Sequence, residues 1–175
     1  GASMGKTDPE PLIVVCDTGP IIHLDELDGL DLLDDFSQVL VPEAVWQEVQ
    51  RHRPTACHHD SVTLQRVSPD TPAPPELEAV AQLLNLHAGE WEALQVATEH
   101  PQSLLLTDDT AARLAANSLG IRPRGTIGLL VRAIRRGQRS KTEVLALLRS
   151  LPARSTLHLK RSLLDAVIAD VELGA

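Results

Sequence analysis

The sequence is poor in aromatic residues, cysteines and long apolar runs. It has two tryptophans, one phenylalanine and no tyrosine among 175 residues, so side chains on which nucleic-acid bases could stack are nearly absent. The two cysteines, Cys16 and Cys57, do not suggest a disulfide framework, and a cytoplasmic location is expected. No apolar stretch has the length needed to cross a bilayer, so no membrane association is expected.

Positive charge is scarce in the first part of the chain and abundant in the next. Residues 1–110 carry 4 Lys/Arg against 20 Asp/Glu, whereas residues 111–161 carry 12 against 1. Two interpretations fit this pattern. Either the arginines merely solvate helix surfaces, or a basic surface borders an acidic site, which would suit a polyanion held near metal ions.

The apolar run at residues 12–16 stops abruptly at Asp17. A β-branched run without polar alternation predicts a strand buried on both faces, as in a parallel sheet. Further strands are predicted at 39–41, 62–67, 104–106 and 121–125, and later helices at 126–136, 141–151 and 160–172. This alternation predicts an α/β fold with a mainly parallel central sheet and helices on both faces.

The chain is predicted to form one domain with a helical C-terminal extension. Residues 1–10 are interpreted as a tag remnant followed by a disordered N-terminus. Residues 11–137 would form the main domain, and residues 138–175 would form a helical extension packed on it. The last helix carries an apolar stripe that either packs on the domain or contacts a second copy of the chain.

Four acids occupy positions where a parallel sheet gathers ligands. Asp17 and Asp109 follow buried strands, Glu48 lies on the helix after the second strand, and Glu90 begins a later helix. Ligands in open α/β sheets bind at the carboxyl ends of the strands, so these acids can converge at one edge. Crowded carboxylates repel one another unless cations lie between them, and oxygen donors without a Cys/His cluster favour Mg²⁺ or Mn²⁺ over zinc. Spacing alone leaves solvated surface acids and helix capping open.

Four segments, taken in order, resemble the motifs of PIN-domain proteins. They are VVCDTGPII at 14–22, VPEAVWQEV at 41–49, GE at 89–90 with its following apolar residues, and LLTDD at 105–109 with the alanine-rich helix after it. The segment GTIGLL at 125–130 is similar to a branch of uncharacterised PIN-like proteins related to VapC toxins. The resemblance covers roughly residues 11–135 and implies a three-layer α/β/α sandwich.

This resemblance implies a Mg²⁺- or Mn²⁺-dependent ribonuclease that hydrolyses RNA phosphodiester bonds. The catalytic acids, which would also bind the metal, are Asp17, Glu48, Glu90 and Asp109. The side chains that could orient or support these carboxylates are Thr18, Thr107 and Asp108. If the protein is the toxin of a toxin–antitoxin pair, a small antitoxin protein would be its partner. A homodimer is the other assembly considered.

A group of basic residues in the second half of the chain is the candidate RNA-binding surface. Its members are Arg113, Arg135, Arg136, Arg139 and Lys141. The alternative, for the two arginines at 135–136, is that they are cations that favour a helix C-terminus. Because aromatic residues are so few, RNA is expected to be recognised by shape and backbone rather than by base stacking.

Other interpretations remain beside the ribonuclease. Residues 17–19 also spell the aspartic-protease triplet, but those enzymes pair two such loops in a β-rich fold. A phosphoacceptor domain would need a lysine at the end of a later strand, and no lysine lies between Lys6 and Lys141. The main alternative is a catalytically inactive PIN-like module that binds RNA or protein.

Two groups with ligand-type side chains are interpreted as structural. The run CHHD at 57–60 lacks the spacing of a zinc site and is predicted to be a mobile loop. His23 is predicted to be a histidine of the helix surface or the core rather than a general base.

Overall fold

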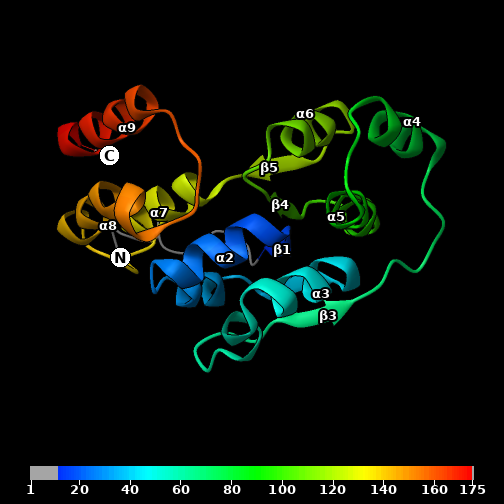
Figure 1. The fold of residues 1–175 in the computed structure, drawn as a ribbon, viewed down its shortest axis with the longest axis horizontal. Helices are drawn as coiled ribbons and strands as arrows, with labels where there is room; N and C mark the ends of the chain where they lie inside the picture. Colours follow the sequence, from blue (N-terminus) through cyan, green and yellow to red (C-terminus); the bar gives the residue numbers. More distant parts are fainter. Residues whose placement is uncertain (1–11, 175) are drawn as a thin grey trace, which may run out of the picture.

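A computed structural model describes residues 12–174 and has one central sheet (Figure 1). The segment interpreted as a tag remnant and disordered N-terminus lies outside the described residues. The strands are β1 (Ile13–Cys16), β2 (Gln38–Pro42), β3 (Gln65–Val67), β4 (Leu104–Leu106) and β5 (Arg122–Arg124). Their order across the sheet is β3-β2-β1-β4-β5, and each neighbouring pair is parallel. The mainly parallel sheet predicted from the sequence is therefore confirmed, with β1 at its centre.

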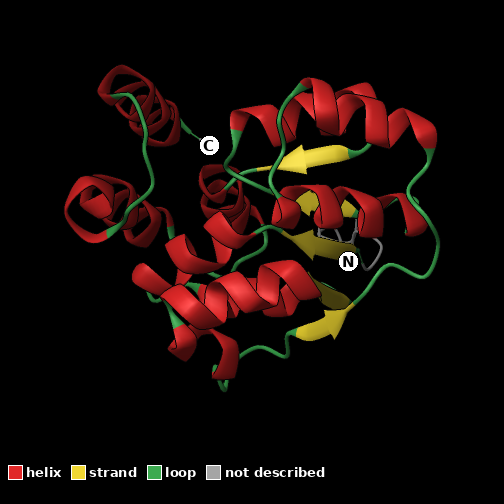
Figure 2. Cartoon of the chain, turned by 45° about the vertical axis from the view of Figure 1, so that its right-hand side comes forward, coloured by secondary structure: helices red, strands yellow, loops and turns green. Residues whose placement is uncertain are grey.

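Helices connect the strands and continue after the last one. The α-helices are α2 (Thr18–Glu26), α3 (Glu43–His52), α4 (Pro75–Leu83), α5 (Ala88–Glu99), α6 (Thr110–Ser118), α7 (Thr126–Arg135), α8 (Lys141–Arg154) and α9 (Arg161–Leu173). Two short 3-10 helices are η1 (Leu30–Asp35) and η2 (Pro54–His58). The sheet lies between layers of helices, which is the predicted α/β/α sandwich (Figure 2).

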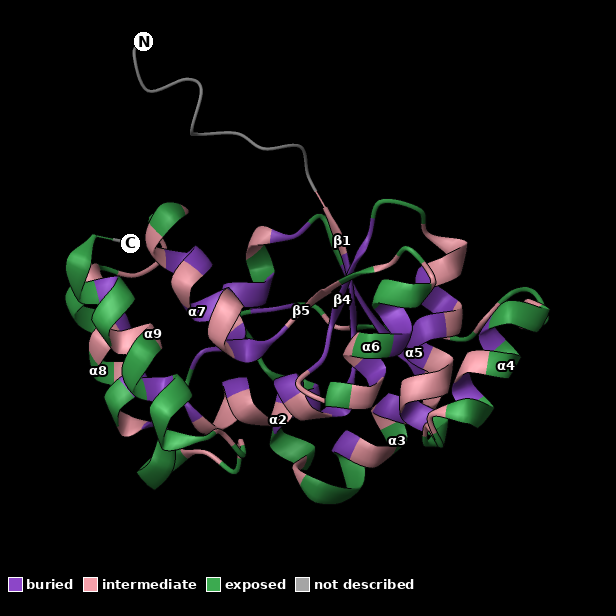
Figure 3. Cartoon of the chain, turned by 90° about the horizontal axis from the view of Figure 1, so that it is seen from above, coloured by how far each residue is buried: buried purple, intermediate pink, exposed green. Residues whose placement is uncertain are grey.

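Alternation along the strands produces two separate hydrophobic cores. Val14 and Cys16 of β1 face a core that includes residues of α2, α7, α8 and α9. Val15 lies between its register partners Leu40 and Leu105, and these three residues face the other core, with residues of α4, α5 and α6. Because both faces of β1 are covered, an uninterrupted apolar strand is what this position requires. Figure 3 shows the buried strands in the middle of the molecule and exposed surface on the outer helices.

The C-terminal helices contribute to the first of these cores. Val144 and Leu148 of α8 and Leu164 of α9 are buried in it. Val167 and Ile168 of the apolar stripe pack against the same core, so the stripe packs on the domain. Figure 1 shows α8 and α9 at the end of the molecule opposite α4.

The prediction of a mobile loop at 57–60 is wrong for the first half of that segment. Pro54 begins η2, and both Ala56 and Cys57 are buried against the core below α3. A proline fits the first turn of a helix, and a free cysteine packs as a small apolar residue, so this stretch is held in place although its sequence is polar. None of the helices in residues 12–174 combines the length and apolarity needed to cross a membrane.

Candidate active site at the carboxyl edge of the sheet

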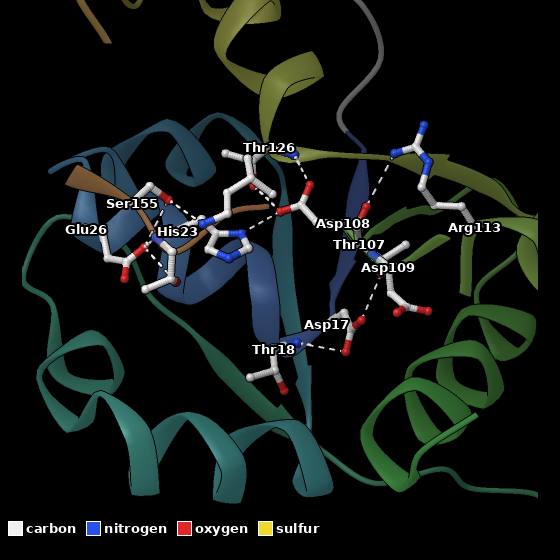
Figure 4. A network of polar contacts seen from close by, with 12 residues as sticks. Asp17, Thr18, His23, Glu26, Thr107, Asp108, Asp109, Arg113, Thr126 and Ser155 are labelled. Carbon is white, nitrogen blue, oxygen red and sulfur yellow. Dashed lines mark hydrogen bonds and ion pairs between the residues drawn. The ribbon is translucent and has the colours of Figure 1, made fainter. Parts of the chain in front are cut away.

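Asp17 lies at the centre of the candidate site because it directly follows the central strand β1. Its side chain is buried, and each carboxylate oxygen accepts one hydrogen bond (Figure 4). The backbone N–H of Thr18 donates to Oδ1 at 2.8 Å, and the hydroxyl of Thr107, after β4, donates to Oδ2 at 2.8 Å. These two bonds fix the orientation of the carboxylate.

The same two threonines connect Asp17 with two further predicted acids. The Thr107 hydroxyl accepts a hydrogen bond from the Asp109 N–H at 3.2 Å, and the Asp109 carboxylate caps α6 by accepting from the Ala112 N–H at 2.8 Å. The Thr18 hydroxyl donates to Oε2 of Glu48 on α3 at 3.0 Å. The structure thus brings acids from three different elements to one edge of the sheet.

Glu90 joins this edge from the first turn of α5. Its Oε1 accepts a hydrogen bond from the His87 N–H at 2.8 Å, as part of a capping box. The preceding residue, Gly89, brings the backbone of α5 close to the site. A Cβ atom at Gly89 would lie 3.3 Å from Oε2 of Glu48 and 3.7 Å from the Thr18 hydroxyl, so a residue without a side chain suits this approach.

The electrostatics of the acids show that they are crowded together. Burial raises the pKa of Asp17 to about 6 against its two hydrogen bonds, and the neighbouring Asp109 and Glu48 add to the rise. Burial also raises the pKa of Glu90 to about 7, with contributions from Asp109 and Asp17. Asp17 therefore lies within electrostatic reach of the other three predicted acids, although all four are far apart in the sequence.

Three of the acids, Asp17, Glu90 and Asp109, line a cavity of about 400 Å³. In residues 12–174, no three Asp, Glu, His or Cys side chains are grouped tightly enough to hold a metal ion, so the acids border a shared cavity without converging on one point. The donor set nevertheless fits a hard divalent cation, because every donor is a carboxylate oxygen, and burial together with the neighbouring acids raises two of the carboxyl pKa values. A cation placed among them would relieve this repulsion.

A second polar group borders the same cavity. Asp108 was expected to support the carboxylates, but its contacts with His23 and Thr126 were not predicted. His23 of α2 shares a hydrogen bond with Oδ2 of Asp108 at 2.7 Å, and the N–H of Thr126 donates to Oδ1 of Asp108 at 2.8 Å (Figure 4). Although burial acts to raise it, the pKa of Asp108 is held below its usual value by the hydrogen bonds from His23 and Thr126. A single histidine in an amphipathic helix carries no sequence signal for a partner so far along the chain.

The residues predicted to contact RNA do not form a single surface. Arg113 is the one that lies beside the acids, with its guanidinium directed to the Thr107 carbonyl at 3.4 Å (Figure 4). Arg135 at the end of α7 is exposed and lies near enough to Arg124 to affect it electrostatically. Both remain candidates for nucleic-acid contact.

The other three predicted basic residues have partners within the protein. Arg136 pairs with Asp35 at 2.7 Å, and Arg139 pairs with Asp31 at 2.8 Å. Lys141 donates to a backbone carbonyl of α9 at 2.8 Å. These contacts join η1 to the turn between α7 and α8, and α8 to α9, so these three side chains stabilise the fold.

Comparison with known proteins agrees with this architecture. A protein-family model described as a PIN domain matches residues 13–173. The match includes α8 and α9 and so extends past the region in which the sequence motifs were found. A search of curated proteins found no significant match. The sheet order, the acids at its carboxyl edge and the family match together lead to one assignment: the chain belongs to the PIN-domain family, whose members are generally nucleases.

Proposed function

We propose that this protein is a ribonuclease that uses Mg²⁺ or Mn²⁺ to hydrolyse RNA phosphodiester bonds. The observation that carries the proposal is the buried carboxylate of Asp17. It is fixed by Thr18 and Thr107 and borders a cavity that Glu90 and Asp109 also line. A buried acid that neighbouring acids crowd is costly for folding, so a function that uses its charge explains its presence.

The chain's own residues have distinct tasks in this proposal. The acids that would hold the cation are Asp17, Glu48, Glu90 and Asp109. When bound, the cation would supply an activated water and neutralise charge on the phosphate. The Thr107 hydroxyl, which contacts both Asp17 and Asp109, sets the orientation of one carboxylate relative to the backbone of the other. Thr18 orients the Glu48 carboxylate through its hydroxyl and the Asp17 carboxylate through its backbone N–H.

Cleavage of labelled RNA and DNA by the purified protein tests the proposal. RNA should be cut with Mn²⁺ or Mg²⁺ and left intact with EDTA. Asp17→Asn, which removes one charge from the site, should lower the rate at least about a hundredfold. The matched control is Asp170→Asn, an exposed acid of α9, and its rate should equal that of the unmodified protein. Equal cleavage by the Asp17 variant would refute the assignment.

One observation favours a second candidate function. Because the carboxylates border the cavity without converging, the chain could be a PIN-fold module that binds RNA and does not cleave it. The two candidates differ in metal binding. Calorimetry of the nuclease should show a saturable Mn²⁺ site that is lost in Asp17→Asn, whereas the binding module should show no such site.

A toxin role with a small antitoxin partner is the narrower form of the proposal. It is supported by the similarity of GTIGLL at 125–130 to relatives of VapC toxins. Induced expression of the protein in a bacterial host should then arrest growth, and the Asp17→Asn variant should not. Normal growth at equal protein levels would remove the toxin role and leave the nuclease proposal standing.

A further inference from the structure

The arginines of this protein fall into two groups according to their partners. Eight arginines in residues 12–174 have a carboxylate oxygen within 4.0 Å, and these ion pairs are spread over the molecule. For the other five arginines of the described chain, no carboxylate partner is present. They are Arg51, Arg113, Arg122, Arg124 and Arg135. All but Arg51 belong to β5 or to the helices that flank it.

Among these four arginines, the charges of three act on the fourth, Arg124. Besides burial, the three positive charges that act on the pKa of Arg124, lowering it, are Arg135, Arg122 and Arg113. Arg122 and Arg124 lie on the same side of β5 because side chains alternate along a strand. Repulsion between these arginines is unfavourable in the free protein, and an anion bound beside Arg124 would relieve it.

Two glycines make room for the arginines closest to the acids. A Cβ atom at Gly128 would lie 2.6 Å from Cδ of Arg124, so the Arg124 side chain passes directly over the α7 backbone. A Cβ atom at Gly125 would lie 2.9 Å from a terminal nitrogen of Arg113 and 2.8 Å from Oδ1 of Asp108. A glycine inside a helix lowers helix stability, so Gly128 has a cost that the placement of Arg124 explains.

Arg113 and Arg124 line a groove of about 530 Å³ together with Lys160, which we call the arginine groove. It adjoins the acid cavity, because Asp108 and His158 line both. A polyanion that approaches the acid cavity alone would be repelled by its carboxylates. A strand that also lies in the arginine groove would meet positive charge next to that cavity.

We propose that the arginine groove binds phosphates of the RNA strand next to the bond that is cleaved, with Arg113 and Arg124 as the phosphate-binding residues. The identity of the strand as RNA rests on the proposed function. The two guanidinium groups favour a phosphate chain, because each is planar and binds phosphate oxygens in pairs, and each nucleotide brings one charge. An acidic peptide is the competing occupant.

Binding of a fluorescent single-stranded RNA in EDTA, measured by anisotropy over a range of salt concentrations, tests the groove without catalysis. The variants are Arg113→Gln, Arg124→Gln and both together. Affinity should fall in each variant, and the slope of log affinity against log salt should decrease by about one per arginine removed. Arg149→Gln is the control, since it removes the same charge from an exposed pair with Glu172 on α8 and α9. Its affinity and slope should not change.

Two further measurements separate a binding defect from a folding defect and show whether the groove prefers a nucleic acid or an acidic peptide. Arg124→Lys keeps the charge and should recover most of the salt slope, whereas Arg124→Gln should keep its helical circular dichroism and lose that slope. Slopes that are equal in all variants would overturn the proposal. So would a polyglutamate peptide that displaces RNA as effectively as a DNA strand of the same charge.

A cleavage assay with Mn²⁺ distinguishes failure of the groove from failure of the nuclease proposal. If both hold, Arg113→Gln and Arg124→Gln raise KM and retain kcat. Groove-dependent binding without any cleavage would refute the nuclease and leave the arginine groove as a nucleic-acid site. Cleavage with unchanged KM and unchanged salt slopes would refute the groove and leave the nuclease standing.

Discussion

At the scale of single residues, the Thr107 hydroxyl is the contact on which the acid arrangement depends most directly. It donates to Asp17 and accepts from the Asp109 N–H, and its side chain is fully buried. Thr107→Val removes both bonds while keeping the shape. Mn²⁺ affinity measured by calorimetry should fall about 10- to 100-fold, and unfolding free energy should fall by about 1–3 kcal/mol. Thr107→Ser keeps the hydroxyl and should recover most of both, and a Val variant that binds Mn²⁺ normally would contradict this role.

Glu90 offers a prediction about pH in the absence of metal. Its ordinary pKa of 4.5 is raised to about 7 in the folded protein, so the folded state loses stability as pH rises from 4.5 through 7. Glu90→Gln keeps the acceptor for the His87 N–H and removes the charge. In EDTA at pH 8 the variant should be more stable by about 1–2 kcal/mol, after a reduction for partial exposure. The gain should vanish near pH 4.

Urea unfolding at both pH values measures the effect of Glu90→Gln. The exposed Asp60, which lies outside any helix, supplies the control, since Asp60→Asn should not change stability appreciably at either pH. Saturating Mn²⁺ should reverse the order, because the unmodified protein would gain binding energy that the variant lacks. Equal stabilities of the variant and the unmodified protein at pH 8 in EDTA would show that the negative charge of Glu90 does not destabilise the folded protein.

How far the sequence predicts the site differs from residue to residue. Asp17 and Asp109 could be placed because each ends an apolar strand, and strand ends of a parallel sheet meet at one edge. Glu48 and Glu90 lie on helices and were also singled out by position, but spacing alone does not choose firmly among many acids, so their role as metal ligands came from the family resemblance. His23 and Arg124 were not identified, since their roles come from long-range neighbours and from glycine-permitted packing that no local pattern encodes.

At the scale of elements, η1 and α7 are joined by one acid between two arginines. Asp35 pairs with Arg136 at 2.7 Å and with the buried Arg132 at 2.9 Å, and Arg132 also lies over the Phe36 ring at 4.4 Å. Hydrogen bonding from Arg136, against a smaller effect of burial, holds the pKa of Asp35 below its ordinary value of 3.8. These two ion pairs of Asp35 therefore join the acid-rich η1 to the arginines of α7 and its C-terminal end.

Asp35→Asn should destabilise the protein by about 1–3 kcal/mol at neutral pH, because it leaves Arg132 buried with no carboxylate. The sign of the pH effect follows from the lowered pKa. The contribution of Asp35 is present above pH 3.8 and is lost as pH falls through its lower folded-state pKa. Urea unfolding from pH 7 to pH 2.5 should show the two proteins converging at the acid end. A constant difference across that range would contradict an ionic role.

Element prediction succeeded where burial on both faces leaves a strong pattern and was weaker at the edges of the sheet. The central strands β1, β2 and β4 are continuous apolar runs and were predicted nearly at their observed bounds. The edge strand β3 was predicted to begin at residue 62 and begins at Gln65, because its polar residues carry little alternation. The buried η2 was missed, since only packing under α3 distinguishes it from a loop.

At the scale of the whole molecule, the uneven charge of the sequence is partly neutralised inside the fold. Asp28, Asp31 and Asp35 pair with arginines of α7, of α8 and of the turn between these helices. Neither interpretation of the sequence pattern describes this, because both placed the arginines on the surface. The distinction matters for function: these paired arginines hold η1 and the turn before it to the C-terminal part of the chain, whereas Arg113, which has no carboxylate partner, lies beside the acids.

The same docking predicts that the C-terminal helices unfold together with the sheet. Two probes report on different parts of the chain. Trp46 and Trp91 pack against the first and second cores, and no aromatic residue follows Trp91. Tryptophan emission therefore follows the sheet region, while circular dichroism also includes α8 and α9. Because Leu148 of α8 is fully buried in the core beside β1, the two urea transitions should coincide.

Leu148→Ala tests this coupling from the helical end. The cavity should lower the unfolding free energy by about 2–5 kcal/mol, and both transitions should move to lower urea by the same amount. The exposed Leu163 of α9 provides the control, since Leu163→Ala should shift neither transition appreciably. A dichroism change that precedes the fluorescence change would mean that α8 and α9 form a separate unit. Unfolding of α8 and α9 alone would then also open the acid cavity and the arginine groove, since Leu157 and His158, between these two helices, line both.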